Sequence, residues 1–383
     1  MTRLHSFFFI INGFLIGLFS LASTPFLKLQ TLFIIYLSFT FFHLILLSVT
    51  SSINKKRLEI ILIIFFFTSI AIINTLMREH YEPVSGWPSL SAFAIFSFYY
   101  IFKEEFDQNS KNIILTVITI LFFTLIFLVI YIDYPLLGLT PSGQSTFENL
   151  LREDIRLGNV DKEIFYNKNY VAKYFFWTFF FFFIYRFQKD KIDKLNILLL
   201  VIIILLTLFL ASAKLFIISL INFFTYLSFS NYNKKIITFI PIVLLLFLFF
   251  YFFNFSNNVT ELISSKAGSL TGDSFRLSLI FDGVKLTADN FFGSGLYYTR
   301  EQLITYTHNN YIETIVAIGP FLSLFFFIYM YLRFKKFYKV KHINIIFNTL
   351  IFLSFFQTIY FDFFILPVVL CFISNYQKIN DYK

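Results

Sequence analysis

Residues 195–230 read LNILLLVIIILLTLFLASAKLFIISLINFFTYLSFS, and Lys214 is the only charged residue among them. A single helix of this length would extend roughly 54 Å, whereas the hydrocarbon core of a bilayer is about 30 Å thick. The small residues Ala211-Ser212-Ala213 directly precede the lysine and suit a tight connection. We therefore predict two short helices, 194–211 and 213–230, that fold back on each other at this point.

The composition of the whole chain agrees with a membrane location. The chain has 383 residues, of which 58% are hydrophobic and 14% charged, and its mean hydropathy is +0.74. Soluble domains are typically about a quarter charged. Windows of about 19 residues predict ten further spans: 6–23, 30–50, 58–76, 87–102, 112–133, 170–187, 236–253, 310–332, 343–358 and 361–376. The sequence thus predicts an all-α, polytopic integral membrane protein with about 12 transmembrane helices in one membrane domain, 1–383.

The first span also has features of a signal peptide. Arg3 precedes an apolar stretch from Phe7 to Ala22, which ends in small residues. Because many further spans follow, we expect this segment to be retained as the first transmembrane helix.

The positive charge is distributed as the positive-inside rule requires. The net charge of +9 would be compatible with nucleic-acid binding in a soluble protein, but the basic residues lie in short segments between apolar runs. All of these segments fall on one side if both termini are cytoplasmic and Lys214 faces outward. The predicted outer side then carries two long loops, at about 134–169 and 254–309. We expect no nucleic-acid partner. The basic inner segments contain Lys55-Lys56-Arg57, Lys103, Lys111, Arg186, Lys189, Lys191, Lys194, Lys234-Lys235, Arg333, Lys335, Lys336, Lys339 and Lys341.

Cysteine and histidine usage argues against two kinds of site. Cys371 is the only cysteine, which excludes an intramolecular disulfide. The five histidines form no Cys/His cluster, so we expect no metal site and no cofactor.

Lys214 has two interpretations. An ammonium group within a long apolar stretch costs a few kcal/mol unless it reaches the interface or meets an anion. It is either a lysine that extends to the membrane surface at a tight turn, or a cation that holds a lipid-linked phosphate or pyrophosphate.

The second outer loop contains Thr271-Gly272-Asp273-Ser274-Phe275-Arg276. The apolar residues that follow have helical spacing, which predicts a short amphipathic helix on the membrane surface with Ser274 or Asp273 as its N-cap. Arg276 would lie in the first turn, where the helix dipole disfavours a cation. Its partner is therefore either Asp273 or a bound anion. The spaced apolar residues are Leu277, Ile280, Phe281 and Val284.

Two further motifs lie where this loop approaches the next apolar segment. Gly293-Ser294-Gly295 predicts a tight turn whose backbone is able to approach a ligand. The run His308-Asn309-Asn310-Tyr311-Ile312-Glu313 places a histidine at the predicted membrane boundary. Histidine suits general acid–base work near neutral pH, although a boundary histidine is also often a simple polar residue. The other histidines, His5, His43, His80 and His342, do not lie in a comparable run.

The order of these features resembles the family of O-antigen ligases and O-antigen (Wzy-type) polymerases. The similar stretch runs from Ser274 to Phe327 and comprises Arg276, the Gly293-Ser294-Gly295 turn, the His308 run and Gly319. Ser212-Ala213-Lys214 resembles the family's Ser-Arg pair, with lysine in place of arginine, and Asn167-Lys168-Asn169 resembles its Asn-x-Asn. The family has a second glycine after the position of Gly319, whereas this chain has Pro320-Phe321-Leu322-Ser323 there.

The resemblance implies a fold similar to the membrane glycosyltransferases of the GT-C type. The expected substrate is a glycan on undecaprenyl pyrophosphate, processed at the outer face of the bacterial cytoplasmic membrane. Fixed cations would stabilise the leaving pyrophosphate without a metal, and the acceptor hydroxyl would lose its proton to a base. The implied catalytic residues are His308, Arg276 and Lys214. The implied substrate-binding residues are Asn309, Arg152, Arg156, Asn169, Gly293 and Gly295.

Several activities fit this interpretation. A polymerase would join repeat units on the lipid carrier, possible partners being a chain-length regulator and other glycan-assembly proteins. A ligase would transfer the finished glycan to lipid A–core. A flippase or transporter of lipid-linked sugars belongs to a different class, and the nearly bare midplanes of the predicted spans argue against it. A structural scaffold would leave the polar cluster of the second outer loop unexplained.

Overall fold

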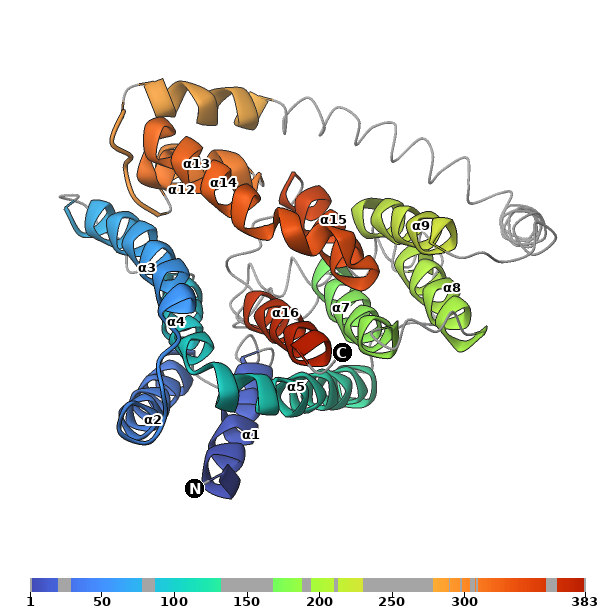
Figure 1. The fold of residues 1–383 in the computed structure, drawn as a ribbon. Coiled ribbons are helices and arrows are strands. Elements are labelled where there is room, and N and C mark those ends of the chain that lie inside the picture. The colour runs from blue at the N-terminus through green and yellow to red at the C-terminus, as the bar shows by residue number, and fades with distance from the viewer. Residues whose placement is uncertain are drawn as a thin grey trace, which may run out of the picture.

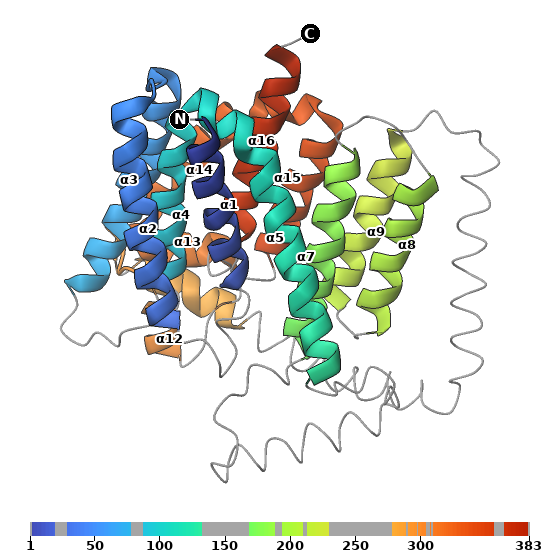
Figure 2. The ribbon, with the colours of Figure 1, turned by 90° about the horizontal axis from the view of Figure 1, so that it is seen from below.

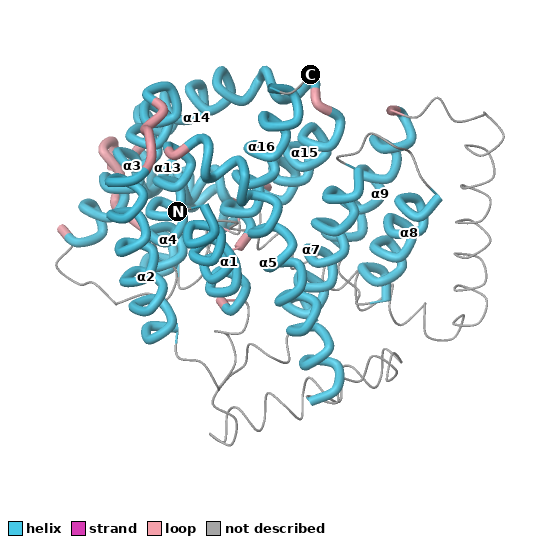
Figure 3. Tube along the Cα trace, turned by 60° about the horizontal axis from the view of Figure 1, so that its bottom comes forward, coloured by secondary structure: helices cyan, strands magenta, loops and turns pink. Residues whose placement is uncertain are grey.

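The computed structural model describes residues 2–19, 29–77, 87–131, 168–187, 194–209, 213–229, 278–288, 290–296, 298–303, 307, 309–355 and 364–381. Within these ranges all regular structure is helical, in agreement with the predicted all-α class (Figures 1 and 3). The elements are α1 (Thr2–Leu18), α2 (Leu29–Thr50), α3 (Lys55–Leu76), α4 (Trp87–Ser97), η1 (Phe98–Ile101), α5 (Lys103–Tyr131), α7 (Lys168–Phe187), α8 (Lys194–Phe209), α9 (Ala213–Ser228), α12 (Tyr298–Leu303), α13 (Asn310–Ile318), α14 (Pro320–Phe334), η3 (Lys335–Lys339), α15 (Lys341–Ser354) and α16 (Ile365–Asp381), together with a helix at 278–288.

The prediction of two helices within residues 194–230 is confirmed, because α8 ends at Phe209 and α9 begins at Ala213. Three described helical stretches are long and apolar enough to cross a membrane, namely Thr31–Thr50, Lys55–Leu76 and Lys103–Ile126. Several shorter apolar helices accompany them. The architecture is therefore compatible with a membrane protein. The predicted span 236–253 lies outside the described residues.

The prediction of one continuous span over 310–332 is wrong. Helix α13 ends at Ile318 and α14 begins at Pro320, with Gly319 between them at φ +83°. A proline at the first helical position starts a helix readily, because its missing N–H is not needed there. The Ser323 hydroxyl donates to the Thr314 carbonyl at 3.2 Å, which ties the two helices together beside the break.

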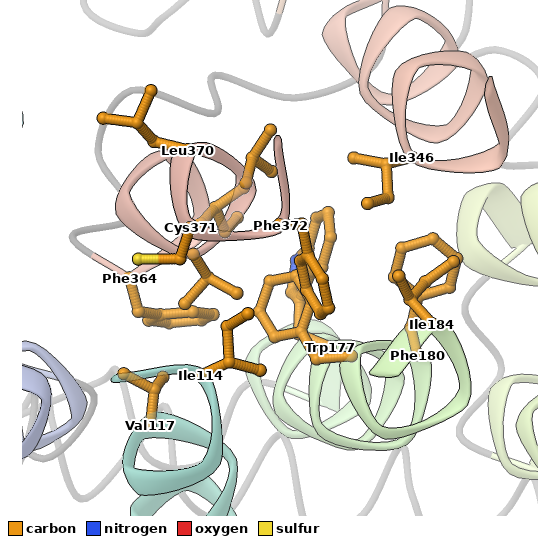
Figure 4. Close-up of a cluster of buried hydrophobic side chains, with 14 of the residues drawn as sticks. Ile114, Val117, Trp177, Phe180, Ile184, Ile346, Phe364, Leu370, Cys371 and Phe372 are labelled. Carbon is orange, nitrogen blue, oxygen red and sulfur yellow. The ribbon is translucent and has the colours of Figure 1, made fainter. Parts of the chain in front are cut away.

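The hydrophobic core extends through most of the described helices, and α5, α7, α15 and α16 meet in one part of it. Ile114 of α5, Trp177 of α7 and Phe372 of α16 meet there with Ile346 of α15 nearby (Figure 4). Helix α1 packs closely on α5 through two glycines. A Cβ on Gly13 would lie 3.2 Å from the Ile113 Cα, and one on Gly17 would lie 2.7 Å from the Ile120 Cβ. Small residues four positions apart permit such close helix contact.

One end of the bundle is held by charge. Arg57 in the first turn of α3 forms a buried bidentate ion pair with Asp107 in the first turns of α5, at 2.9 and 3.0 Å. Ser374 of α16 also hydrogen-bonds to Asp107, and the Arg57 guanidinium lies 4.1 Å from the Tyr100 ring centroid. We call this the ion-pair end. The start of α1 and the end of α16 lie at the same end (Figure 2). Arg57 was predicted to lie in a loop, but it is buried in a helix.

At the opposite end of α3, side chains of the helix bond to backbone groups of distant segments. The Leu296 N–H donates to the Thr75 Oγ1 at 2.8 Å, and the Asn74 side chain donates to the Phe292 and Ala317 carbonyls at 2.9 and 3.1 Å. We call the end where Thr75 meets the Gly293-Ser294-Gly295 turn the glycine end. Helices α3 and α14 run antiparallel between the two ends, because Arg333 pairs with Glu59 near the ion-pair end.

Candidate functional site

The run that contains His308 enters α13 through a capped helix start. Asn309 is the N-cap residue, and its Oδ1 accepts hydrogen bonds from the Tyr311 and Ile312 N–H groups at 3.0 and 3.2 Å. Asparagine is among the preferred N-cap residues because its side-chain oxygen satisfies such orphan donors. Asn309 is buried, so this part of its side chain has a structural role. Its predicted contact with substrate stays a prediction.

A buried carboxylate fixes the segment before α13. Glu313 is 6% exposed. Its Oε1 accepts from the Thr307 N–H at 2.9 Å and from the Thr307 hydroxyl at 2.8 Å, and its Oε2 accepts from the Thr299 hydroxyl at 2.7 Å. Three donors satisfy the two oxygens of this buried carboxyl group, as buried polar groups require. Glu313 therefore joins α12, the segment at Thr307 and α13.

This network includes both sequence neighbours of the predicted catalytic histidine. His308 lies outside the described residues, but Thr307 and Asn309 on either side of it are both buried and hydrogen-bonded. The Asn309 N–H also contacts the Thr307 Oγ1 at 3.3 Å. The backbone on both sides of position 308 is therefore held by side chains of its own motif.

The helix predicted after Arg276 is present at 278–288 and lies against this segment. A Cβ on Gly283 would lie 2.6 Å from the Thr307 Cγ2 and 2.8 Å from the Ile312 Cγ2. Only a glycine allows the helix to approach this closely without a shift. The structure thus brings the helix after Arg276 beside the residues that flank His308, whereas Arg276 itself lies outside the described residues.

Gly293 and Gly295 are positioned by packing against the protein itself. Their φ angles are +89° and +83°, in the region that favours glycine. A Cβ on Gly295 would lie 2.4 Å from the Thr75 backbone nitrogen, and one on Gly293 would lie 2.5 Å from the Ala317 carbonyl oxygen. The Ser294 and Gly295 N–H groups donate to the carbonyls of Val316 and Ala317. These glycines seat the turn on α3 and α13, and their contact with a ligand stays a prediction.

Lys214 lies in the first turn of α9 and is half-buried. A second lysine, Lys173 of α7, is buried, and the charges of the two ammonium groups interact unfavourably. Asn169 lies in the first turn of α7, four residues before Lys173. The starts of α7 and α9 are thus close together. The sequence analysis missed Lys173, although a lysine in an aromatic helix is as visible a signal as Lys214.

Helix α15 connects the lysine region with the histidine segment (Figure 1). Near its start the Lys341 ammonium donates to the Phe229 carbonyl at the end of α9, and further along Thr349 donates to Asn222 at 2.9 Å. At its other end the Ile351 carbonyl accepts from the Tyr311 hydroxyl at 3.3 Å. Helices α9 and α15 therefore run antiparallel, and Lys214 and Tyr311 lie toward the same end of α15.

The remaining predicted residues, Arg152 and Arg156, lie outside the described residues. The described part of the chain contains no group of three His, Cys, Asp or Glu side chains suited to a metal ion. Glu313 was not among the predicted site residues. The sequence does carry a signal for it, since an acidic residue shortly after an Asn or Thr is typical of a capped helix start.

Comparison with known proteins gives no relative: no family model, no curated protein and no solved structure matches the chain.

Proposed function

We propose that the chain is a metal-independent glycosyltransferase of the bacterial cytoplasmic membrane, with about 12 transmembrane helices and both termini cytoplasmic. It acts on undecaprenyl-pyrophosphate-linked oligosaccharide at the outer face and polymerises repeat units of O-antigen or capsule. The resemblance of residues 274–327 to O-antigen polymerases and ligases motivates this proposal. The observation that carries it furthest is the buried Glu313 network, which fixes both neighbours of His308.

In the proposed reaction the glycosidic bond to the pyrophosphate breaks as the acceptor hydroxyl attacks. His308 takes the proton of that hydroxyl, and Arg276 and Lys214 stabilise the charge that develops on the leaving pyrophosphate. The helix at 278–288 supports this arrangement, because its contact with Thr307 and Ile312 links the Arg276 segment to the His308 segment.

The test is genetic and biochemical. We would delete the gene, complement the strain with wild type or His308→Ala, and run the extracted surface glycans on a gel. We expect single-repeat products in place of a ladder in both the deletion strain and the His308→Ala strain, at normal membrane levels of the protein. His342→Gln is the matched control and should restore the ladder. It changes a histidine at the start of α15, whereas the His308 segment lies toward the end of that helix. A ladder restored by His308→Ala would remove the catalytic role of this histidine.

The donor assignment has its own test. Charge reversal in Arg276→Glu should weaken binding of the lipid-pyrophosphate donor and raise the donor concentration needed for half-maximal transfer. Unchanged donor dependence would contradict the assignment of this arginine to the pyrophosphate.

The carrier and the location of the accumulated glycan separate the alternatives. Long polymer that accumulates on the lipid carrier would identify a ligase. Lipid-linked repeat units that remain on the inner leaflet would identify a flippase or transporter. This second class gains support from the buried polar side chains Asn12, Thr40 and His43, since such groups within membrane helices often mark a transport path.

A further inference from the structure

Five polar side chains of α1, α2 and η1 form a continuous buried chain. The His5 Nδ1 and the His43 Nε2 are 3.3 Å apart, although neither histidine lies in a sequence motif like that of His308. The His43 Nδ1 lies 3.1 Å from the Tyr99 hydroxyl. Asn12 donates to that hydroxyl at 2.8 Å and accepts from Thr40 at 2.8 Å. This chain is also a correction to the expected bare midplanes, because Thr40 lies near the middle of α2.

The directions of the hydrogen bonds made by the two histidines follow from Thr50, which bonds to His5. Thr50 donates its only hydroxyl hydrogen to the Leu46 carbonyl at 2.8 Å, so at 3.1 Å its Oγ1 accepts from the His5 Nε2–H. The His5 Nδ1 is then the acceptor for the His43 Nε2–H. The His43 Nδ1 in turn accepts the Tyr99 hydroxyl hydrogen. With both rings neutral and protonated on Nε2, each histidine nitrogen has one partner.

The same geometry accommodates exactly one additional proton on the pair. A proton added to the His5 Nδ1 makes His5 an imidazolium that donates to the His43 Nε2. The His43 proton then resides on Nδ1 and is donated to the Tyr99 oxygen. The Tyr99 hydroxyl hydrogen turns to the Thr40 carbonyl, which lies 3.5 Å away. A second proton would place two N–H groups face to face, so the chain has no arrangement for it.

The charged groups around the pair favour His5 over His43 as the seat of this charge. His43 is fully buried, and the Phe8 ring is stacked on it at 4.6 Å. His5 is buried as well, at 3% exposed, and burial disfavours a charge on it; Glu105 of α5 favours that charge, and the amino terminus opposes it. Glu105 Oε2 is buried and has no hydrogen-bond partner among the described residues. Tyr36 of α2 interacts electrostatically with Tyr99, the partner of His43.

We propose that His5 and His43 form a one-proton site, in which an added proton charges His5, switches the tautomer of His43 and turns the Tyr99 hydroxyl. The site links α1, α2 and η1, so proton uptake changes the hydrogen bonds between these helices. This inference is independent of the proposed glycosyl transfer.

The test uses the full chain, labelled with ¹⁵N-histidine and reconstituted in nanodiscs, with nitrogen NMR spectra recorded from about pH 8 to about pH 4 to bracket the ordinary histidine pKa. Signals are assigned with His5→Gln and His43→Gln. We expect the His43 Nδ1 signal to move from the lone-pair range to the N–H range over the same pH interval in which His5 becomes an imidazolium. His342 is the control, since it is buried but neither of its ring nitrogens has a hydrogen-bond partner among the described residues.

Three results would overturn the proposal: a His5 that charges while His43 keeps its tautomer, two imidazolium rings, or no change at either ring. Tyr99→Phe removes only the hydroxyl and tests the last step. In this variant we expect the His43 tautomer to become independent of the charge on His5. A tautomer change that still follows His5 would show that the hydroxyl plays no part.

Discussion

Different interactions hold the helices together at the two ends of the bundle. At the ion-pair end, side chains from α3, α5 and α16 satisfy one another through Arg57, Asp107 and Ser374. At the glycine end, backbone groups meet directly, because Gly293 and Gly295 leave no room for a Cβ. The first end depends on complementary charge and the second on the smallest possible side chain. Substitutions that change charge and substitutions that change size should therefore affect the two ends selectively.

The largest effect is expected from breaking the ion pair. Arg57→Met leaves the Asp107 carboxylate buried without its cation, which typically costs about 4 kcal/mol of folding free energy. We expect a strongly lowered melting temperature of the purified protein in mild detergent. The double variant Arg57→Met/Asp107→Leu should recover much of this loss, because no unpaired charge remains. A double variant as unstable as the single one would show that the ion pair is not the main determinant of this end.

Breaking the glycine end should cost nearly as much. Gly295→Ala introduces a Cβ against the Thr75 backbone at a φ of +83°, and strain and overcrowding together amount to about 3 kcal/mol. The same melting experiment measures the effect. Ser294→Ala is the matched control at the adjacent position, since the buried Ser294 hydroxyl has no hydrogen-bond partner among the described residues. Equal melting temperatures for Gly295→Ala and wild type would contradict the close approach.

Glu313→Gln should reduce stability less than the two changes above, and it tests whether the glycine end also supports activity. Glu313→Gln replaces a carboxylate that accepts three hydrogen bonds by an amide whose NH₂ group faces donors, at a cost of about 2 kcal/mol. We expect reduced glycan transfer in a protein that still reaches the membrane, because the segment around position 308 loses its anchor. The Arg57→Met/Asp107→Leu variant should retain transfer. Full transfer by Glu313→Gln would contradict the positioning role.

The smallest effect is expected where α13 meets α15. Tyr311→Phe removes the hydroxyl that donates to the Ile351 carbonyl and interacts with Ser354, and it keeps the ring contacts with Phe327 and Phe355, so the loss is about 1 kcal/mol. A small decrease in melting temperature would check this. A decrease as large as that of Gly295→Ala would contradict the minor role of this hydroxyl.

Local features were predictable for a physical reason. The break between α8 and α9 follows from the length of an apolar run against the thickness of a bilayer, which requires no knowledge of distant residues. The helix after Arg276 likewise follows from apolar spacing within one segment. The break at Gly319 was missed because a glycine inside an apolar run also occurs in continuous helices, and the decisive contact is its close approach to Phe291.

The sequence by itself determined the helical class, the short helices of residues 194–230 and the helix after Arg276, because these depend on neighbours within a few turns. Only the tertiary structure decided the pairs His5 with His43, Arg57 with Asp107 and Lys173 with Lys214. Each pair joins residues about 40 or 50 positions apart. Hydrophobic periodicity specifies which face of a helix is buried, but it does not specify which other helix will cover that face. That choice depends on the packing of the whole bundle.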